Sequence, residues 1–198
     1  MKKVIFLIFM ACISLTYAQE DQIISIHQLG SHDNLDSNKS YYFKDINRDL
    51  DKFLGTWHYD DGNKKLTLVF SKQTHFSIGK HYCDQIYARF KYEENGTVIY
   101  NTLGDFSNSA RLKIVGSGFD LSNLNKMNLF YNEPTTVIYD RISTKSLKPS
   151  PSLDIEYLPC STIGCNPQLK WNIIYYKEVG NTAPNPFKIP FDLTLTKQ

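Results

Sequence analysis

After its first residues the sequence has no long apolar run, which excludes a later membrane-spanning helix. The one such run, Val4 to Leu15, follows Lys2 and Lys3 and precedes the small-residue pattern Thr16-Tyr17-Ala18. This is the pattern of a secretory signal peptide, so we interpret residues 1–18 as a signal that is cleaved before Gln19. The protein is therefore expected to be secreted or periplasmic, without a transmembrane segment after cleavage.

Two alternatives to cleavage are disfavoured by the same residues. The run is short for an uncleaved N-terminal anchor. Cys12 would be the acceptor of a lipoprotein, but Phe9-Met10-Ala11 before it is a poor context for lipid attachment.

The chain also lacks an excess of either charge, with 22 basic and 20 acidic residues. Removing the signal takes away Lys2 and Lys3, which leaves a nearly neutral mature chain. A nucleic-acid partner would require a strongly basic face, so we expect none.

Cysteine is scarce, with four in the chain, and Cys12 leaves with the signal. Cys160 and Cys165 flank a turn-like insert, and export makes a disulfide between them plausible. Cys83 is then unpaired, or itself pairs with one of the two; the sequence does not decide between these pairings.

Sustained helical periodicity, internal repeats and linkers rich in Gly or Pro are all absent. Short alternating segments are present instead, such as Gln85 to Tyr92, which places Ile86, Ala88, Phe90 and Tyr92 on one face. Asn95-Gly96 after it is a strong hairpin signal. The fold class predicted is all-β: an antiparallel β-barrel of about eight to ten strands.

The predicted domain organisation is simple. Residues 19–40 are polar and are interpreted as a flexible N-terminal arm, and residues 41–198 as a single barrel domain. Leu50, Phe53 and Leu54 have helical spacing and predict a short N-terminal lid helix. Asp120 to Lys126 is expected to form one or two helical turns, after a turn at Gly116-Ser117-Gly118 ends a strand.

Aromatic residues are abundant, with 13 Tyr and 12 Phe. On the predicted strands they form a candidate lining for the barrel, which consists of Trp57, Tyr59, Phe70, Phe90, Tyr92, Tyr100, Tyr139, Trp171 and Tyr175. One interpretation is a cavity for a small apolar or ring-bearing ligand. The other is that these side chains fill the core completely.

The segment Phe53-Leu54-Gly55-Thr56-Trp57-His58-Tyr59 resembles the Gly-x-Trp opening of lipocalins and related barrels. That resemblance implies that the predicted antiparallel barrel is lipocalin-like, with a short helix that closes the barrel base and the Trp packed beneath it. Residues 42–57, 87–103 and 189–195 resemble a family of secreted proteins of unknown function common in flavobacteria-type bacteria. The second resemblance implies a signal, a barrel and a single domain, and it assigns no catalytic residue.

No set of residues predicts catalysis or a cofactor. His81, Cys83 and Asp84, with His58 and His75 near in sequence, lack the convergent spacing of a zinc site, and we expect no metal. Ser77-Ile78-Gly79-Lys80 has Ser-x-x-Lys spacing but lies at a strand end, where the amine does not reach the hydroxyl. The protein is therefore expected not to be an enzyme.

The function predicted is that of a binding protein that holds a small apolar or aromatic ligand in its barrel. The alternative is an envelope or extracellular module with a solidly packed barrel, which binds a protein partner through exposed tyrosines such as Tyr87, Tyr131 and Tyr176.

Overall fold

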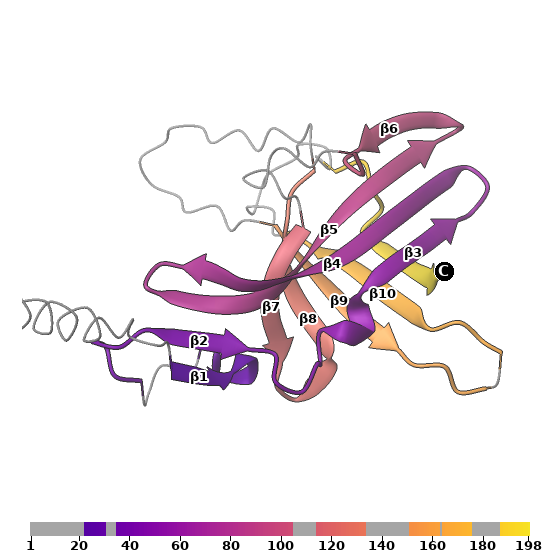
Figure 1. Ribbon diagram of the computed structural model, residues 1–198. Helices are drawn as coiled ribbons and strands as arrows, with labels where there is room; N and C mark the ends of the chain where they lie inside the picture. The colour runs from indigo at the N-terminus through magenta and orange to yellow at the C-terminus, as the bar shows by residue number, and fades with distance from the viewer. Residues whose placement is uncertain (1–21, 31–34, 105–113, 134–150, 163, 176–186) are drawn as a thin grey trace, which may run out of the picture.

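The computed structural model describes residues 22–30, 35–104, 114–133, 151–162, 164–175 and 187–198 (Figure 1). Strands dominate these ranges, and the only helical segments in them are two 3-10 turns. In chain order the elements are β1 Gln22–Ser25, η1 Ile26–Gln28, β2 Tyr41–Lys44, η2 Asp51–Phe53, β3 Gly55–Asp60, β4 Lys64–Ile78, β5 His81–Glu94, β6 Thr97–Asn101, β7 Ile114–Asp120, β8 Asn123–Tyr131, β9 Ser152–Leu158, β10 Gln168–Ile174 and β11 Asp192–Lys197.

Eight of these strands form a closed antiparallel barrel. Each barrel strand pairs with the next in the order β3, β4, β5, β7, β8, β9, β10, β11, and β11 pairs with β3. Two of these pairings, which we call seams, are short. At one seam β5 pairs with β7 through Ile86↔Gly116 and its neighbours. At the other, β11 pairs with β3 through Thr196↔His58 and Lys197↔Trp57. The predicted all-β barrel is confirmed.

One edge of β5 carries three partners in succession. Near its start β5 pairs in parallel with β2, in its middle with β7, and near its end with β6. β2 and β6 therefore extend the sheet beyond the barrel, and β1 adds a further parallel strand to β2. A strand of 14 residues is long enough to hold all three pairings in a row.

Residues 19–40 were expected to form a flexible arm, but the described part of this segment contains a strand and a 3-10 turn. Residues 22–25 form β1, and the following 3-10 turn η1 buries Ile26. The parallel pairing of Gln22–Ser25 with Tyr41–Lys44 holds this segment against the barrel. A polar composition did not reveal this pairing, because it depends on a partner strand further along the chain.

The N-terminal lid helix is absent from the described residues, and a single 3-10 turn, η2, takes its place. Leu50 and Phe53 are fully buried by this turn. The prediction of a lid helix is therefore wrong: the chain becomes extended at Leu54, and Gly55 follows with φ 105°. Only glycine adopts that conformation without strain, which explains the Gly of Gly-x-Trp.

The helical turns predicted at Asp120 to Lys126 are wrong, because β7 and β8 form a hairpin there. The Asp120 carboxylate accepts hydrogen bonds from the backbone N and the hydroxyl of Ser122, so it stabilises a tight turn. Gly116 lies inside β7 and does not end it. A Cβ on Gly116 would lie 3.1 Å from Leu129 Cδ2, so glycine permits the close approach of β8.

Candidate functional site

Six of the nine predicted lining residues come together inside the barrel. Trp57, Phe70, Phe90, Tyr92, Tyr100 and Trp171 are at most 4% exposed, and all belong to one apolar cluster. Tyr59 and Tyr175 are partly buried against the same cluster. Tyr139 lies outside the described residues. The cluster also contains inward aliphatic residues of every barrel strand except β3, which contributes Trp57, so the described interior is packed with side chains.

Trp57 seals the base of the barrel. Its Nε1 donates to the backbone carbonyl of Phe53 in η2, at 2.8 Å. The Lys197 ammonium lies 5.1 Å from the centroid of its ring, and Tyr157 packs edge-on against it. The base is thus closed by residues from both ends of the domain.

A buried carboxylate, that of Glu133, lies beside Tyr100 and the end of β8. The side chain of Glu133 is 1% exposed and accepts hydrogen bonds from the hydroxyls of Tyr100 and Tyr131 and from the backbone N of Lys188 and Ile189. Four donors offset the cost of burying this carboxylate. The arrangement ties β6, β8 and the approach to β11 together, which is a structural role.

The hydroxyl of Tyr92 is different, because it is buried and has no hydrogen-bond partner. Burial, with smaller contributions from Glu94 and Glu133, raises the pKa of Tyr92 to about 12. Burial and Glu133 likewise raise the pKa of Tyr131 well above its ordinary value. Tyr131 therefore cannot be the exposed protein contact that the sequence suggested. Tyr176 lies outside the described residues.

Cys160 and Cys165 form the predicted disulfide, in the connection between β9 and β10. Cys83 is free and buried, which answers the open question of pairing. Burial raises the pKa of the Cys83 thiol, so this group is a poor nucleophile.

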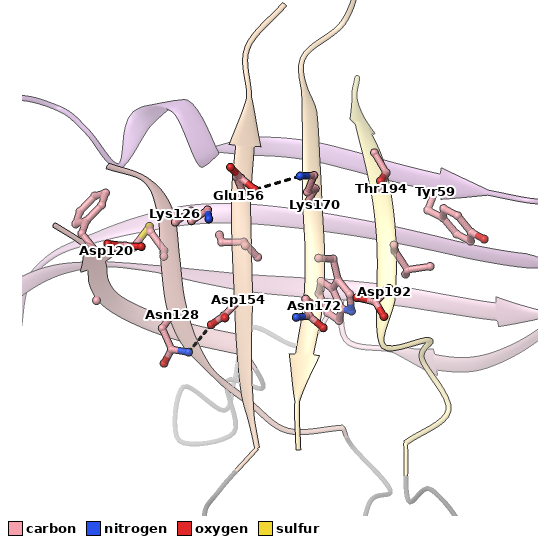
Figure 2. A pocket seen from close by; sticks show the side chains of 16 residues that line it. Tyr59, Asp120, Lys126, Asn128, Asp154, Glu156, Lys170, Asn172, Asp192 and Thr194 are labelled. Atoms are coloured by element: carbon pink, nitrogen blue, oxygen red, sulfur yellow. Dashed lines mark hydrogen bonds and ion pairs between the residues drawn. The ribbon is translucent and has the colours of Figure 1, made fainter. Parts of the chain in front are cut away.

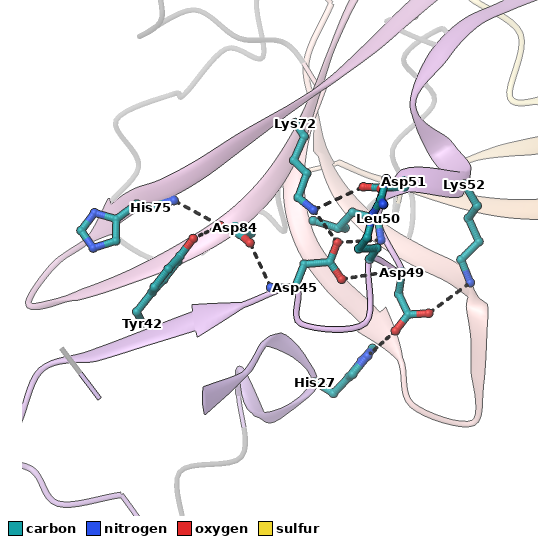
Figure 3. A network of polar contacts seen from close by, with 11 residues as sticks. His27, Tyr42, Asp45, Asp49, Leu50, Asp51, Lys52, Lys72, His75 and Asp84 are labelled. Carbon is teal, nitrogen blue, oxygen red and sulfur yellow. Dashed lines mark hydrogen bonds and ion pairs between the residues drawn. The ribbon is translucent and has the colours of Figure 1, made fainter. Parts of the chain in front are cut away.

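Asp84, a metal candidate from the sequence, has a structural role (Figure 3). It accepts hydrogen bonds from the Tyr42 hydroxyl at 2.5 Å, the Asp45 backbone N at 2.9 Å and the His75 backbone N at 3.2 Å. Within the described ranges, no group of three or more His, Cys, Asp or Glu side chains is placed to hold a metal ion.

Asp45 continues the same network toward the barrel base. Its carboxylate forms a 2.7 Å ion pair with Lys72 and accepts from the backbone N of Asp49 and of Leu50 (Figure 3). Lys72 also contacts Asp51 at 3.3 Å, and the bonds from Arg48 and Lys72 hold the pKa of Asp51 below its usual value. These contacts fix the loop between β2 and η2 against β4.

Two large hollows lie on the outer surface of the barrel. The first, which we call the apolar groove, has a volume of about 940 Å³ and runs between the end of the β4–β5 hairpin and the outer face of β7 and β8. Its apolar lining includes Leu29, Phe76, Ile78, Val115 and Phe130. Phe130 is 70% exposed, an unusual position for a large aromatic side chain.

The second hollow, which we call the polar groove, has a volume of about 920 Å³ and crosses the outer face of β7 to β11 (Figure 2). Alternate residues of these strands point into it, and most are charged or carry amides. Tyr59 lies at one end of the groove and Asp120 at the other.

The sequence predictions did not identify either groove. Alternation along β8 could have placed Phe130 outside, since Leu129 and Tyr131 on either side of it are buried. The polar groove had no comparable local signal, because its residues come together only through the register of separate strands.

The fold and these surfaces define an all-β barrel protein with a packed described interior and two outer grooves. The chain belongs to a family of unknown function, DUF6705, whose model matches residues 1–198. Neither the curated proteins nor the solved structures include a match to the chain. Among the described residues, no helix is long and apolar enough to cross a bilayer.

Proposed function

We propose that this protein is an exported, non-catalytic binding protein with a lipocalin-like barrel, and that it binds an uncharged apolar small molecule in the apolar groove. The observation that carries the proposal is the location of the hollow. The described side chains inside the barrel pack into one apolar cluster, whereas a groove of about 940 Å³ lies outside it. Ligand sites have volumes of about 300–1,000 Å³ and mostly apolar linings with a few polar groups.

The lining of the apolar groove supports an uncharged ligand. None of the described residues that line it carries a charged side chain. The polar residues that line the groove include Gln73 and Gln85, whose side-chain amides form a hydrogen bond of 3.0 Å to each other. Phe130 and Phe76 leave apolar surface exposed to water, and a bound apolar molecule would cover it.

The signal-like N-terminus and the Cys160–Cys165 disulfide support export, because disulfides persist in oxidising compartments. The described polar clusters are engaged in structural contacts, which supports a function without catalysis. A lipocalin-like classification is supported by the closed antiparallel barrel and by Trp57 beneath the closing turn.

Titration of the exported protein with N-phenyl-1-naphthylamine, a neutral apolar dye, tests the proposal. We expect saturable fluorescence enhancement that is at least about tenfold weaker in Phe130→Ser, since about 1.4 kcal/mol of binding free energy is tenfold in affinity. Ile46→Ser is the matched control, because Ile46 is also exposed but lies outside the groove. Equal binding by both variants, or no saturable binding by the unmodified protein, would refute the groove as the ligand site.

The packed interior also favours the second candidate, an interaction module that binds a protein partner through its outer surface. This candidate predicts a stoichiometric protein complex on isolation of the exported chain, and no retained small molecule in native mass spectrometry.

A further inference from the structure

The polar groove is formed by two rows of outward side chains that run across neighbouring strands. One row is Lys126↔Glu156↔Lys170↔Thr194, and the other is Asn128↔Asp154↔Asn172↔Asp192. Neighbouring strands lie about 4.8 Å apart, so each row presents polar groups at a regular spacing along the groove. Figure 2 shows both rows facing the same hollow.

The second row alternates amide and carboxylate groups. An amide both donates and accepts hydrogen bonds, whereas a carboxylate only accepts. A hydroxyl group also both donates and accepts. A ligand with a hydroxyl opposite each position of the row can therefore donate to Asp154 and Asp192 and accept from Asn128 and Asn172.

Part of this surface is already fixed in place. Asn128 donates to Asp154 at 2.6 Å, and Lys170 pairs with Glu156 at 3.3 Å. By contrast, the side chains of Asn172 and Asp192 make no hydrogen bond to another residue that the structure describes. These two groups lie next to each other across β10 and β11, and they have the capacity to bind a ligand.

The net charge of the polar groove indicates which class of polar polymer it can bind. The groove is lined by four carboxylates and two lysines, so its net charge is negative. A nucleic acid or an acidic polysaccharide would be repelled, because binding of such anions requires cationic side chains. A neutral polyhydroxylated chain meets no such repulsion.

An aromatic ring completes the groove at the seam of the barrel. The pairing of β11 with β3 includes Thr196↔His58 and stops there, and Tyr59 is the next residue of β3. The ring of Tyr59 lines the groove beyond that point. An aromatic face beside hydrogen-bonding groups suits a sugar ring, which has apolar C–H faces and a polar hydroxyl edge.

We infer that the polar groove binds a neutral oligosaccharide, laid across β8 to β11 with its hydroxyls on the Asn128–Asp154–Asn172–Asp192 row. This site adjoins the apolar groove, with which it shares Gly118 and Asn128, but Phe130 does not line it, and the inference does not depend on the function proposed for the apolar groove. Phe130→Ser is accordingly expected to leave oligosaccharide binding unchanged.

An array of neutral and acidic oligosaccharides, followed by calorimetric titration with the best-bound neutral member, tests the inference. We expect the double variant Asn172→Ala/Asp192→Ala to bind that sugar at least tenfold more weakly. The control is Lys64→Ala/Glu94→Ala, which removes a cross-strand polar pair of β4 and β5 that lies outside the groove. Circular dichroism of both variants verifies that the barrel is retained.

Three results would overturn the inference. They are the absence of any bound oligosaccharide, binding confined to acidic members of the array, and equal affinity in the double variant and the control. Capture of a protein whose binding is lost in the double variant, without binding of any sugar, would also overturn it.

Discussion

The indole Nε1 of Trp57 and the backbone carbonyl of Phe53 form a 2.8 Å hydrogen bond at the base of the barrel. Both residues are fully buried, so water cannot replace either partner. The bond joins the first barrel strand to the turn that closes the base, and it gives the Gly-x-Trp segment a physical role.

Replacement of Trp57 with Phe is expected to destabilise the fold by about 1–3 kcal/mol, because it leaves the Phe53 carbonyl buried without a donor. Urea unfolding monitored by circular dichroism measures this loss. Val98→Ala, at an exposed position of β6, is the control and should change stability by less than about 0.5 kcal/mol. A loss at Trp57 no greater than that of the control would contradict the sealing role of the indole.

Local patterns predicted much of the barrel. The alternation of Ile86, Ala88, Phe90 and Tyr92 predicted that these four side chains share one face, and all four are buried. Asn95-Gly96 predicted the turn between β5 and β6, and both residues have positive φ there. These signals worked because they depend on neighbours within a few residues.

Long-range features could not be predicted in this way. The β1–β2 pairing, the polar rows and the buried Glu133 all require partners that are distant in the sequence. Tyr131 was interpreted as exposed because a tyrosine hydroxyl usually reaches water, but Glu133 provides a buried acceptor for it. The identity of such a partner depends on strand register, which a single strand does not encode.

Tyr92 and Tyr131 provide a matched pair of substitutions with opposite expected signs. Tyr92→Phe removes a buried hydroxyl that has no partner, and should stabilise the fold by about 1 kcal/mol or more. Tyr131→Phe removes a donor to the buried carboxylate of Glu133, and should destabilise it by about 1.5–3 kcal/mol. Chemical denaturation of both variants gives the comparison, and the same sign for the two would show that the hydroxyls do not differ as described.

The raised pKa of Tyr92 predicts a loss of stability in alkali. The ordinary value is 10.0 and the folded value is about 12, so the folded protein holds this proton more tightly than the unfolded chain. Ionisation of Tyr92 therefore does not affect stability below about pH 10, and stability falls as the pH rises from 10 toward 12, because the unfolded chain ionises this group more readily. Stability measured from pH 9 to 12 should fall less steeply in Tyr92→Phe than in the unmodified protein. Parallel curves would contradict the assignment.

The Cys160–Cys165 disulfide closes a short loop and is expected to contribute about 2 kcal/mol. The double variant Cys160→Ser/Cys165→Ser should therefore have a lower midpoint of urea unfolding than the unmodified protein. Added reductant provides the control, because it should lower the midpoint of the unmodified protein and leave that of the variant unchanged. If reductant lowered the unfolding midpoint of both proteins by a similar amount, the Cys160–Cys165 disulfide would not be the cause of that effect.

Lys72 is the cation that offsets the buried charge of Asp45, whose side chain is completely inaccessible to solvent (Figure 3). Lys72→Met keeps the length and the apolar stem of the side chain but leaves that carboxylate without its cation. Breaking a buried pair in this way costs about 3–5 kcal/mol, and the partial exposure of Lys72 places our expectation at the lower end. Lys65→Met is the control, since its ion pair with Asp60 is exposed and should contribute far less. Urea unfolding of the two variants checks the order, and a control that is destabilised as much as Lys72→Met would show that the Asp45 network does not hold the loop between β2 and η2.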